Sequence, residues 1–72
     1  MAEDIQKGIV QVDNLLKFEE VSSQVGLGRT AIYRMIGAGD FPAPVKLGRA
    51  SRWSQREVQA WLDERKRERM AS

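Results

Sequence analysis

Apolar positions recur with the period of an α-helix in two adjoining segments within residues 21–36. In the first segment, Val21 and Val25 lie one turn apart on the same face. The apolar face of the second segment consists of Ile32, Met35 and Ile36. Between the segments, Gly26 can adopt the positive φ that a sharp turn requires, and Leu27 would fill the angle between two helices. The pattern predicts a helix-turn-helix.

The polar face of the second predicted helix has a composition suited to contacts with DNA. It presents Arg29, Thr30, Tyr33 and Arg34. Arginine can donate to guanine O6 and N7, threonine can contact a base edge or a thymine methyl, and tyrosine can reach a phosphate or a methyl. A packed helical hairpin with a polar outer face is the alternative, and the apolar spacing alone does not distinguish the two. The turn, the small Ser22 and this polar face occur together, so we interpret these four residues as candidate base-reading residues.

After the second predicted helix the pattern changes from helical spacing to alternation. Gly39 suits the left-handed position that follows a helix, and two prolines, Pro42 and Pro44, prevent its continuation. Residues 45–47 and 51–53 are short alternating segments around Gly48-Arg49-Ala50, which predicts a β-hairpin with Arg49 at its tip. We expect this hairpin to be the wing of a winged helix, with a basic loop as the alternative. The candidate contacts to the DNA backbone are Gly28, Lys46, Arg49 and Arg52.

A third helix is predicted from Ser54 onward, because Ser54-Gln55-Arg56-Glu57 fits the S-x-x-E capping box. Its apolar stripe consists of Val58, Trp61 and Leu62. Aromatic side chains can stack on bases in proteins that bind single strands. The apolar-periodic positions of Trp53 and Trp61 favour packing in the core instead, as do those of Phe18 and Phe41. Tyr33 is the exception, because it lies on the outer face of the second helix.

The predicted fold is mainly α with a small β-hairpin wing, a winged helix-turn-helix with three helices. We expect residues 1–14 to form a flexible N-terminal lead-in, followed by a short extended piece near Leu15-Leu16 that pairs with the wing. Residues 15–65 form the winged helix-turn-helix DNA-binding domain, and residues 66–72 form the charged C-terminal end of the third helix. A chain of 72 residues is one domain near the lower size limit for a self-sufficient core.

The composition argues against an enzyme. The chain has no cysteine and no histidine, which excludes disulfides, thiolate metal sites and histidine-based acid–base chemistry. Its carboxylates are spread over predicted helix faces, so we expect no catalytic site, no metal and no cofactor. No apolar run approaches the roughly 20 residues that span a bilayer, and MAEDIQ does not resemble a secretory signal. We therefore expect a cytoplasmic protein with no membrane partner.

The overall charge of +2 is unevenly distributed. Residues 1–25 carry a net charge of −3, residues 26–56 carry +5, and residues 57–72 are balanced. The net positive charge therefore lies on the predicted recognition helix, the wing and the start of the third helix. A basic surface of this kind indicates a polyanionic partner, here double-stranded DNA.

Residues 15–65 resemble the AlpA-like prophage regulatory family. The resemblance depends on the ordered set GLGRTAIYRMI, FPAPVKLG, RW and EVQAWL, which is specific as a set although each piece alone is weak. The family comprises small winged-helix proteins of bacteria and phages, related in architecture to MerR-type DNA-binding domains and to phage excisionases. Gly28 stands where the family usually has serine, and Gly37 and Ala38 replace residues that are commonly charged. The lead-in is longer than in most relatives.

The resemblance implies a DNA-binding transcriptional regulator or a recombination directionality factor of a mobile element. In either case the recognition helix would lie in the major groove and the wing on the flanking backbone. A regulator would contact RNA polymerase, whereas an excisionase would bend DNA and act with an integrase. One such module buries only about 600–1,000 Å², so we expect a dimer or cooperative assembly on DNA. A second class of function stays open, a protein-interaction module that modulates an integrase or a response regulator.

Overall fold

The structure, a computed structural model, describes residues 13–71. Its elements are β1 (Leu15–Leu16), α2 (Phe18–Val25), α3 (Arg29–Ala38), β2 (Val45–Leu47), β3 (Ala50–Ser54) and α4 (Gln55–Ala71). The predicted fold class, three helices with a small β-hairpin, is confirmed. Of the predicted lead-in, all but Asp13 and Asn14 lie outside the described residues. Within residues 13–71, no helix is both long enough and apolar enough to cross a membrane.

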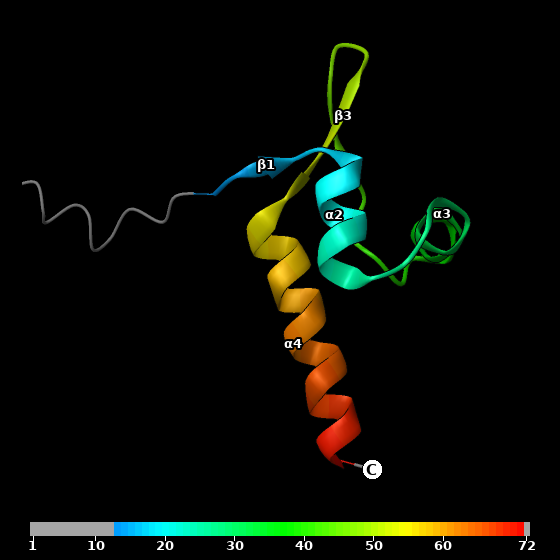
Figure 1. The fold of residues 1–72 in the computed structure, drawn as a ribbon, viewed down its shortest axis with the longest axis vertical. Helices are drawn as coiled ribbons and strands as arrows, with labels where there is room; N and C mark the ends of the chain where they lie inside the picture. Colours follow the sequence, from blue (N-terminus) through cyan, green and yellow to red (C-terminus); the bar gives the residue numbers. More distant parts are fainter. Residues whose placement is uncertain (1–12, 72) are drawn as a thin grey trace, which may run out of the picture.

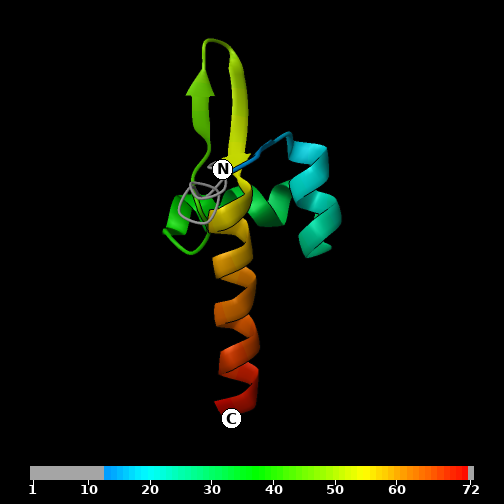
Figure 2. The same cartoon turned by 90° about the vertical axis from the view of Figure 1, so that its left-hand side faces the viewer.

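The hairpin and α4 extend in opposite directions from a centre formed by the other elements (Figure 1). In that view α2 runs nearly parallel to the page beside the start of α4, whereas α3 is seen end-on. After a quarter turn, α3 crosses behind the start of α4 (Figure 2). The helix-turn-helix therefore lies at the middle of the molecule, with the hairpin projecting from one side of it.

The turn between α2 and α3 has the predicted backbone geometry. Gly26 ends α2 in the left-handed region with φ 71°, and Gly39 ends α3 in the same region with φ 80°. The hydroxyl of Ser22 donates to the carbonyl oxygen of Leu27 at 2.6 Å, which ties the last turn of α2 to the connection. A small side chain at position 22 thus fixes the angle at which the chain enters α3.

The three strands form an antiparallel sheet in the order β1-β3-β2. Leu15 lies opposite Ser54 and Leu16 opposite Trp53, so the predicted pairing of this extended piece with the wing is confirmed. Leu47 pairs with Ala50, which leaves a two-residue turn of Gly48 and Arg49. The prediction had placed Ala50 in the turn, and the structure places it in β3.

The core forms where the two helices of the helix-turn-helix meet the sheet. Its buried hydrophobic residues are Leu16, Val21, Ile32, Phe41, Trp53 and Val58. Trp53 has no exposed surface, and its indole N–H donates to the carbonyl oxygen of Pro42 at 3.1 Å. This bond satisfies the one polar group of a side chain that is otherwise apolar. The predicted assignment of Trp53 to the core is confirmed, while Trp61 is half-buried against it.

The start of α4 is capped by two residues that lie far apart in sequence. Ser54 Oγ accepts from the N–H of Glu57 at 3.2 Å, as the capping box predicted. The same hydroxyl donates to Asp13 Oδ2 at 2.6 Å, and Asp13 Oδ1 accepts from the N–H of Arg56 at 3.1 Å. The first turn of a helix has unpaired N–H groups and a positive partial charge, and a carboxylate satisfies both. Asp13 therefore joins the segment before β1 to the helix that follows β3.

We expect Ser54→Ala to lower the free energy of unfolding by about 1 kcal/mol, because it leaves a cap donor and the Asp13 carboxylate without their partner. Urea denaturation followed by circular dichroism measures the change. Ser23→Ala on the exposed face of α2 is the matched control and should stay within about 0.5 kcal/mol of wild type. Equal effects of the two substitutions would contradict the capping role.

Asp13 makes this cap dependent on pH. Donation from Ser54 and then from the Arg56 N–H lowers the pKa of Asp13 from its ordinary value of 3.8. A lowered folded-state pKa means that the carboxylate stabilises the fold in full above the ordinary value and ceases to do so as pH falls through the lower one. We expect wild type to melt at a higher temperature than Asp13→Asn at about pH 6, and the difference to shrink below about pH 4. A difference that stays constant during acidification would exclude the carboxylate charge as its source.

Candidate nucleic-acid interface

The polar side of α3 is a continuous exposed face. Ile32 is fully buried and Met35 and Ile36 pack against the core, so the opposite side of the helix faces away from it. The exposed side carries all four residues predicted to contact bases, Arg29, Thr30, Tyr33 and Arg34. The structure therefore brings these side chains together on one helix, with their polar groups outside the fold.

Two of the four take part in aromatic contacts: Tyr33 forms a cluster with Phe18 and Trp53, and Arg29 lies over the Phe18 ring of that cluster. The Tyr33 side chain is exposed, with 40% of its surface accessible, yet its ring stacks on Phe18 with a centroid separation of 5.9 Å. Both rings meet Trp53 edge-on, at 5.9 Å for Phe18 and 6.1 Å for Tyr33. The guanidinium carbon of Arg29 lies 4.1 Å from the Phe18 ring centroid. Tyr33 is exposed as expected, but it is also fixed in place by the core.

The first turn of α3 has no side-chain cap. Gly28 occupies the N-cap position with φ −86° and ψ 179°, and its carbonyl accepts the first helical bond from Ile32 at 3.0 Å. Because glycine has no side-chain acceptor, the remaining N–H groups of the first turn are available to an external anion. This geometry is what the candidate backbone contact at Gly28 requires.

The three basic residues of the hairpin point in different directions. Successive side chains of a strand alternate between faces, and residues paired across strands share a face. Lys46 pairs with Ser51 and lies on the face of Trp53, where its ammonium donates to Ser51 Oγ at 3.0 Å. Arg52 pairs with Val45 on the opposite, outer face, and Arg49 lies in the turn. The structure therefore places Lys46 and Arg52 on opposite sides of the wing.

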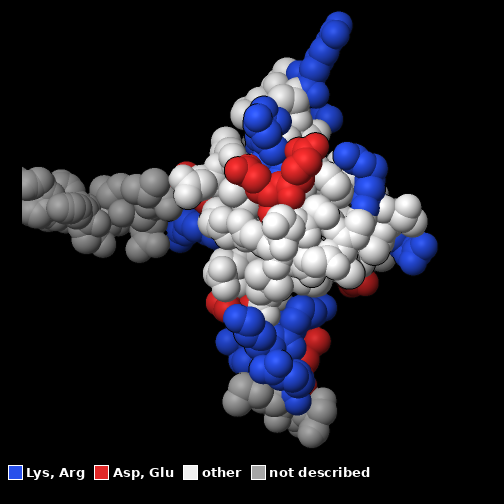
Figure 3. All heavy atoms as spheres, in the orientation of Figure 1, with Lys and Arg blue, Asp and Glu red and all other residues white. Residues whose placement is uncertain are grey.

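Basic side chains lie both on the hairpin and beside α3. Figure 3 shows Lys and Arg side chains at the end of the hairpin and beside α3, with a group of acidic side chains between them near the centre of the view. Among residues 13–69, no carboxylate lies within ion-pair distance of the basic residues of α3 and the wing. These cations are therefore available to an anionic partner.

The charges of α4 behave differently, because they pair with one another. Arg65 contacts Glu68 at 2.8 Å and Arg67 contacts Glu64 at 2.6 Å, each one helical turn apart. The bond from Arg67 lowers the pKa of Glu64 and raises that of Arg67. Exposed pairs of this spacing contribute little to stability individually, but they support a helix whose residues 63–69 include no apolar side chain. The end of α4 therefore shows many basic side chains in Figure 3, but acidic side chains are interspersed among them and two of its arginines are paired.

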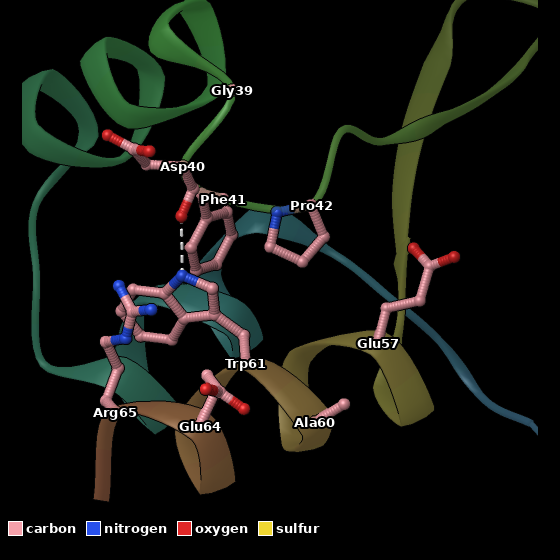
Figure 4. A pocket seen from close by; sticks show the side chains of 9 residues that line it. All are labelled: Gly39, Asp40, Phe41, Pro42, Glu57, Ala60, Trp61, Glu64 and Arg65. Carbon is pink, nitrogen blue, oxygen red and sulfur yellow. Dashed lines mark hydrogen bonds between the residues drawn. The ribbon is translucent and has the colours of Figure 1, made fainter. Parts of the chain in front are cut away.

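A hollow of about 490 Å³ lies between α4 and the connection from α3 to β2 (Figure 4). The Trp61 indole N–H donates to the carbonyl oxygen of Asp40 at 2.6 Å, and its ring meets Phe41 edge-on at 4.8 Å. The Arg65 guanidinium covers the same indole at 5.3 Å. These contacts dock α4 onto the connection that follows α3, at one wall of the hollow.

The sequence analysis did not single out Phe18 as a neighbour of the interface. It assigned Phe18 to the core from its apolar spacing, and the residue is indeed half-buried. What it missed is that one face of the ring is covered by Arg29, which lies on a different helix. Nothing in the sequence around Phe18, such as the neighbouring Lys17 at the start of α2, indicates that an arginine from another helix covers the ring.

An exposed helix face beside a basic β-hairpin defines a winged helix-turn-helix protein. A family profile described as "Prophage CP4-57 regulatory protein (AlpA)" matches residues 14–66, and the chain belongs to this family. It is similar to "Uncharacterized protein ORF88" of Enterobacteria phage P4, with 39% identity over 51 residues. That match covers 69% of this chain and 58% of the phage protein, so the chain spans little more than half of its relative's length. No solved structure matches the chain.

Proposed function

We propose that this protein is a sequence-specific DNA-binding protein of a prophage or mobile element, with α3 in the major groove and the β2–β3 wing on the flanking backbone. The observation that carries the proposal is the exposed polar face of α3 beside a hairpin whose cations have no acidic partner among the described residues. The family profile, that of a prophage regulatory protein, supports the same assignment. An α-helix fits the major groove, where each base pair presents a distinct pattern of donors and acceptors.

On α3, Arg29 and Arg34 are the candidates for guanine O6 and N7, because a guanidinium can donate two parallel hydrogen bonds to them. Thr30 lies between them on the exposed face and would contact a base edge or a thymine methyl. The hydroxyl of Tyr33 would reach a phosphate or a methyl, since its ring is held against Phe18. All four side chains lie on the side of α3 opposite the buried Ile32, so they would point toward the DNA when this side of the helix enters the groove.

The backbone contacts come from two parts of the chain. The uncapped first turn at Gly28 offers N–H groups to a phosphate. Arg49 at the hairpin turn would reach the phosphates flanking the groove, while Lys46 and Arg52 would meet different phosphates because they lie on opposite faces. Such contacts set position and affinity without carrying sequence information.

Two biological uses follow from the same contacts. A transcriptional regulator would occupy a promoter and contact RNA polymerase, whereas an excisionase would occupy an attachment site and bend it in support of an integrase. A single module buries too little surface for tight specific binding, so both uses call for a dimer or adjacent copies on DNA. The identity of the bound fragment distinguishes them.

Fluorescence anisotropy across a salt series tests the proposal. The probes are promoter and attachment-site duplexes from the DNA flanking the gene, with a random duplex of equal length as control. Preference for one fragment, with a salt slope that corresponds to about four to six phosphate contacts, supports DNA recognition. Weak and equal binding to every duplex overturns it.

The protein-interaction function is the second candidate, and one observation favours it. The outer face of the sheet presents Leu15, Val45 and Leu47 with 48%, 44% and 50% of their surfaces exposed. Register places these side chains on the face opposite Trp53. If every duplex binds weakly and equally, this sheet face is the surface through which an integrase or a response regulator would be engaged.

Arg29→Ala is expected to weaken binding to the preferred duplex by about 1–3 kcal/mol, because a bidentate base contact is lost. Binding to random DNA should weaken far less. Arg34→Ala should have the same selective effect. Arg69→Ala is the matched control, since it removes an equal charge at the far end of α4. Equal losses on the preferred and the random duplex would contradict a base-reading role for Arg29.

Arg49→Ala is expected to weaken binding to all duplexes by similar factors, because it removes one phosphate contact. It should also reduce the slope of log K against log salt by about one. The measurement is the slope of log K against log salt for wild type and variant on the same two duplexes. A loss confined to the preferred duplex would contradict the assignment of Arg49 to the backbone.

A further inference from the structure

We propose that Phe18 is a positioning residue for Arg29: its ring holds the guanidinium in the orientation that contacts DNA and so contributes to sequence selectivity from a helix outside the groove. The inference rests on the proposed role of α3 in DNA recognition. It assigns to α2 a part in selectivity that its own surface chemistry does not suggest, because the Phe18 side chain has no hydrogen-bonding group for a base edge.

The geometry begins at Trp53, which is fully buried. Its ring meets Phe18 edge-on with an interplanar angle of 64° and Tyr33 edge-on with an angle of 74°. Phe18 and Tyr33 then stack on each other with only 19° between their planes. Two nearly parallel rings on different helices are thus held by one core side chain, and neither can tilt without disturbing the other.

Arg29 completes this arrangement. Its guanidinium carbon lies 4.1 Å from the Phe18 centroid and 5.8 Å from the Tyr33 centroid, within the range of a cation–π interaction with each. Phe18 is the nearer ring by a wide margin. The contact spans the turn of the helix-turn-helix, so it also couples the start of α3 to the start of α2.

A guanidinium stacked on a ring keeps its hydrogen-bonding capacity. Its five N–H donors lie in the guanidinium plane, whereas attraction to a ring needs only that the cation lie over the ring face, as the Arg29 guanidinium carbon does over Phe18. Among residues 13–69, no carboxylate pairs with Arg29, so these donors are not engaged by an acidic side chain. A free arginine loses rotamer entropy when it is immobilised on DNA, and one already held against a ring has lost part of that entropy beforehand. The stack therefore preorganises the side chain for a bidentate contact.

Arg34 provides an internal comparison. It lies on the same exposed face of the same helix and carries the same charge. Among the described residues no ring stacks on it, whereas Arg29 has two. If Phe18 acts by holding Arg29, its removal should affect the contribution of Arg29 and leave that of Arg34 unchanged. A merely structural role for Phe18 would affect both.

The experiment uses a duplex selected by the wild-type protein from a randomised pool, with a random duplex of equal length beside it. Phe18→Leu keeps the apolar volume and removes the ring. We expect it to lower the affinity ratio between the two duplexes by about two- to fivefold, the size of an exposed cation–π interaction. Phe18→Tyr keeps the ring and is expected to restore the ratio.

Double-mutant cycles then separate positioning from packing. Because Phe18 also stacks on Tyr33, the cycles are carried out on Tyr33→Phe protein, which lacks the hydroxyl proposed to contact DNA but keeps the ring. In that protein, Phe18→Leu should have no further effect on the ratio when Arg29→Ala is present, and its full effect when Arg34→Ala is present. Leu62→Ala, which removes a packed side chain from α4, is the stability control and should leave the ratio unchanged. Circular dichroism melts ensure that every variant is compared while folded.

A spectroscopic measurement on the free protein tests the stack without DNA. Ring current should shift the Arg29 side-chain proton resonances upfield in wild type, and Phe18→Leu should remove most of that shift. An unchanged affinity ratio in Phe18→Leu, or equal effects in the two arginine backgrounds, would overturn the positioning role while DNA recognition stands. If the wild-type protein selects no sequence at all, DNA recognition fails and the positioning role fails with it, although the upfield shift would persist.

Discussion

The burial of Trp53 is the contact on which the other parts of this small fold depend. The side chain projects from the central strand β3 into the space between α2 and α3, and its N–H is satisfied by the carbonyl of Pro42. It therefore touches the helix-turn-helix, the connection to the wing and, through strand pairing, Leu16 of β1. In a chain of 72 residues, few side chains are large enough to reach so many elements at once.

This one contact also relates α3 to the wing. Because Trp53 lies on β3, two residues beyond Ser51 in the hairpin, the position of α3 against its ring sets where the helix lies relative to the wing. The docking of Trp61 on Asp40 secures the other end of α3. The exposed face of α3 is thus held at both ends, by contacts that come from one side of the helix and leave the other free.

Local spacing was sufficient to predict the elements. The apolar face around Ile32 predicted α3, and Ser54 followed by Glu57 predicted the start of α4, since each signal lies within one or two helical turns. The Asp13 cap could not be predicted in the same way, because it bonds to Ser54 across 41 positions. The contact of Phe18 with Arg29 joins different helices, and its existence depends on the angle at the turn.

The hairpin shows how an error of one residue in the predicted length of the turn changes which side chains share a face. A three-residue turn that included Ala50 would have paired Lys46 with Arg52 and placed both on one face. The two-residue turn pairs Lys46 with Ser51 instead, so the two cations lie on opposite faces. Composition and alternation predict that a wing exists, but only the register determines on which face of the wing each basic side chain lies.

The junction of β3 with α4 has no connecting residue, since β3 ends at Ser54 and α4 begins at Gln55. Gln24 and Gln55 exchange two side-chain hydrogen bonds of 2.8 and 2.9 Å at this point, which braces the joint against α2. The wing and the 17-residue helix therefore form one continuous stretch of chain that extends from the core in opposite directions (Figure 2). With no residue between them, the direction in which β3 ends sets the direction in which α4 begins.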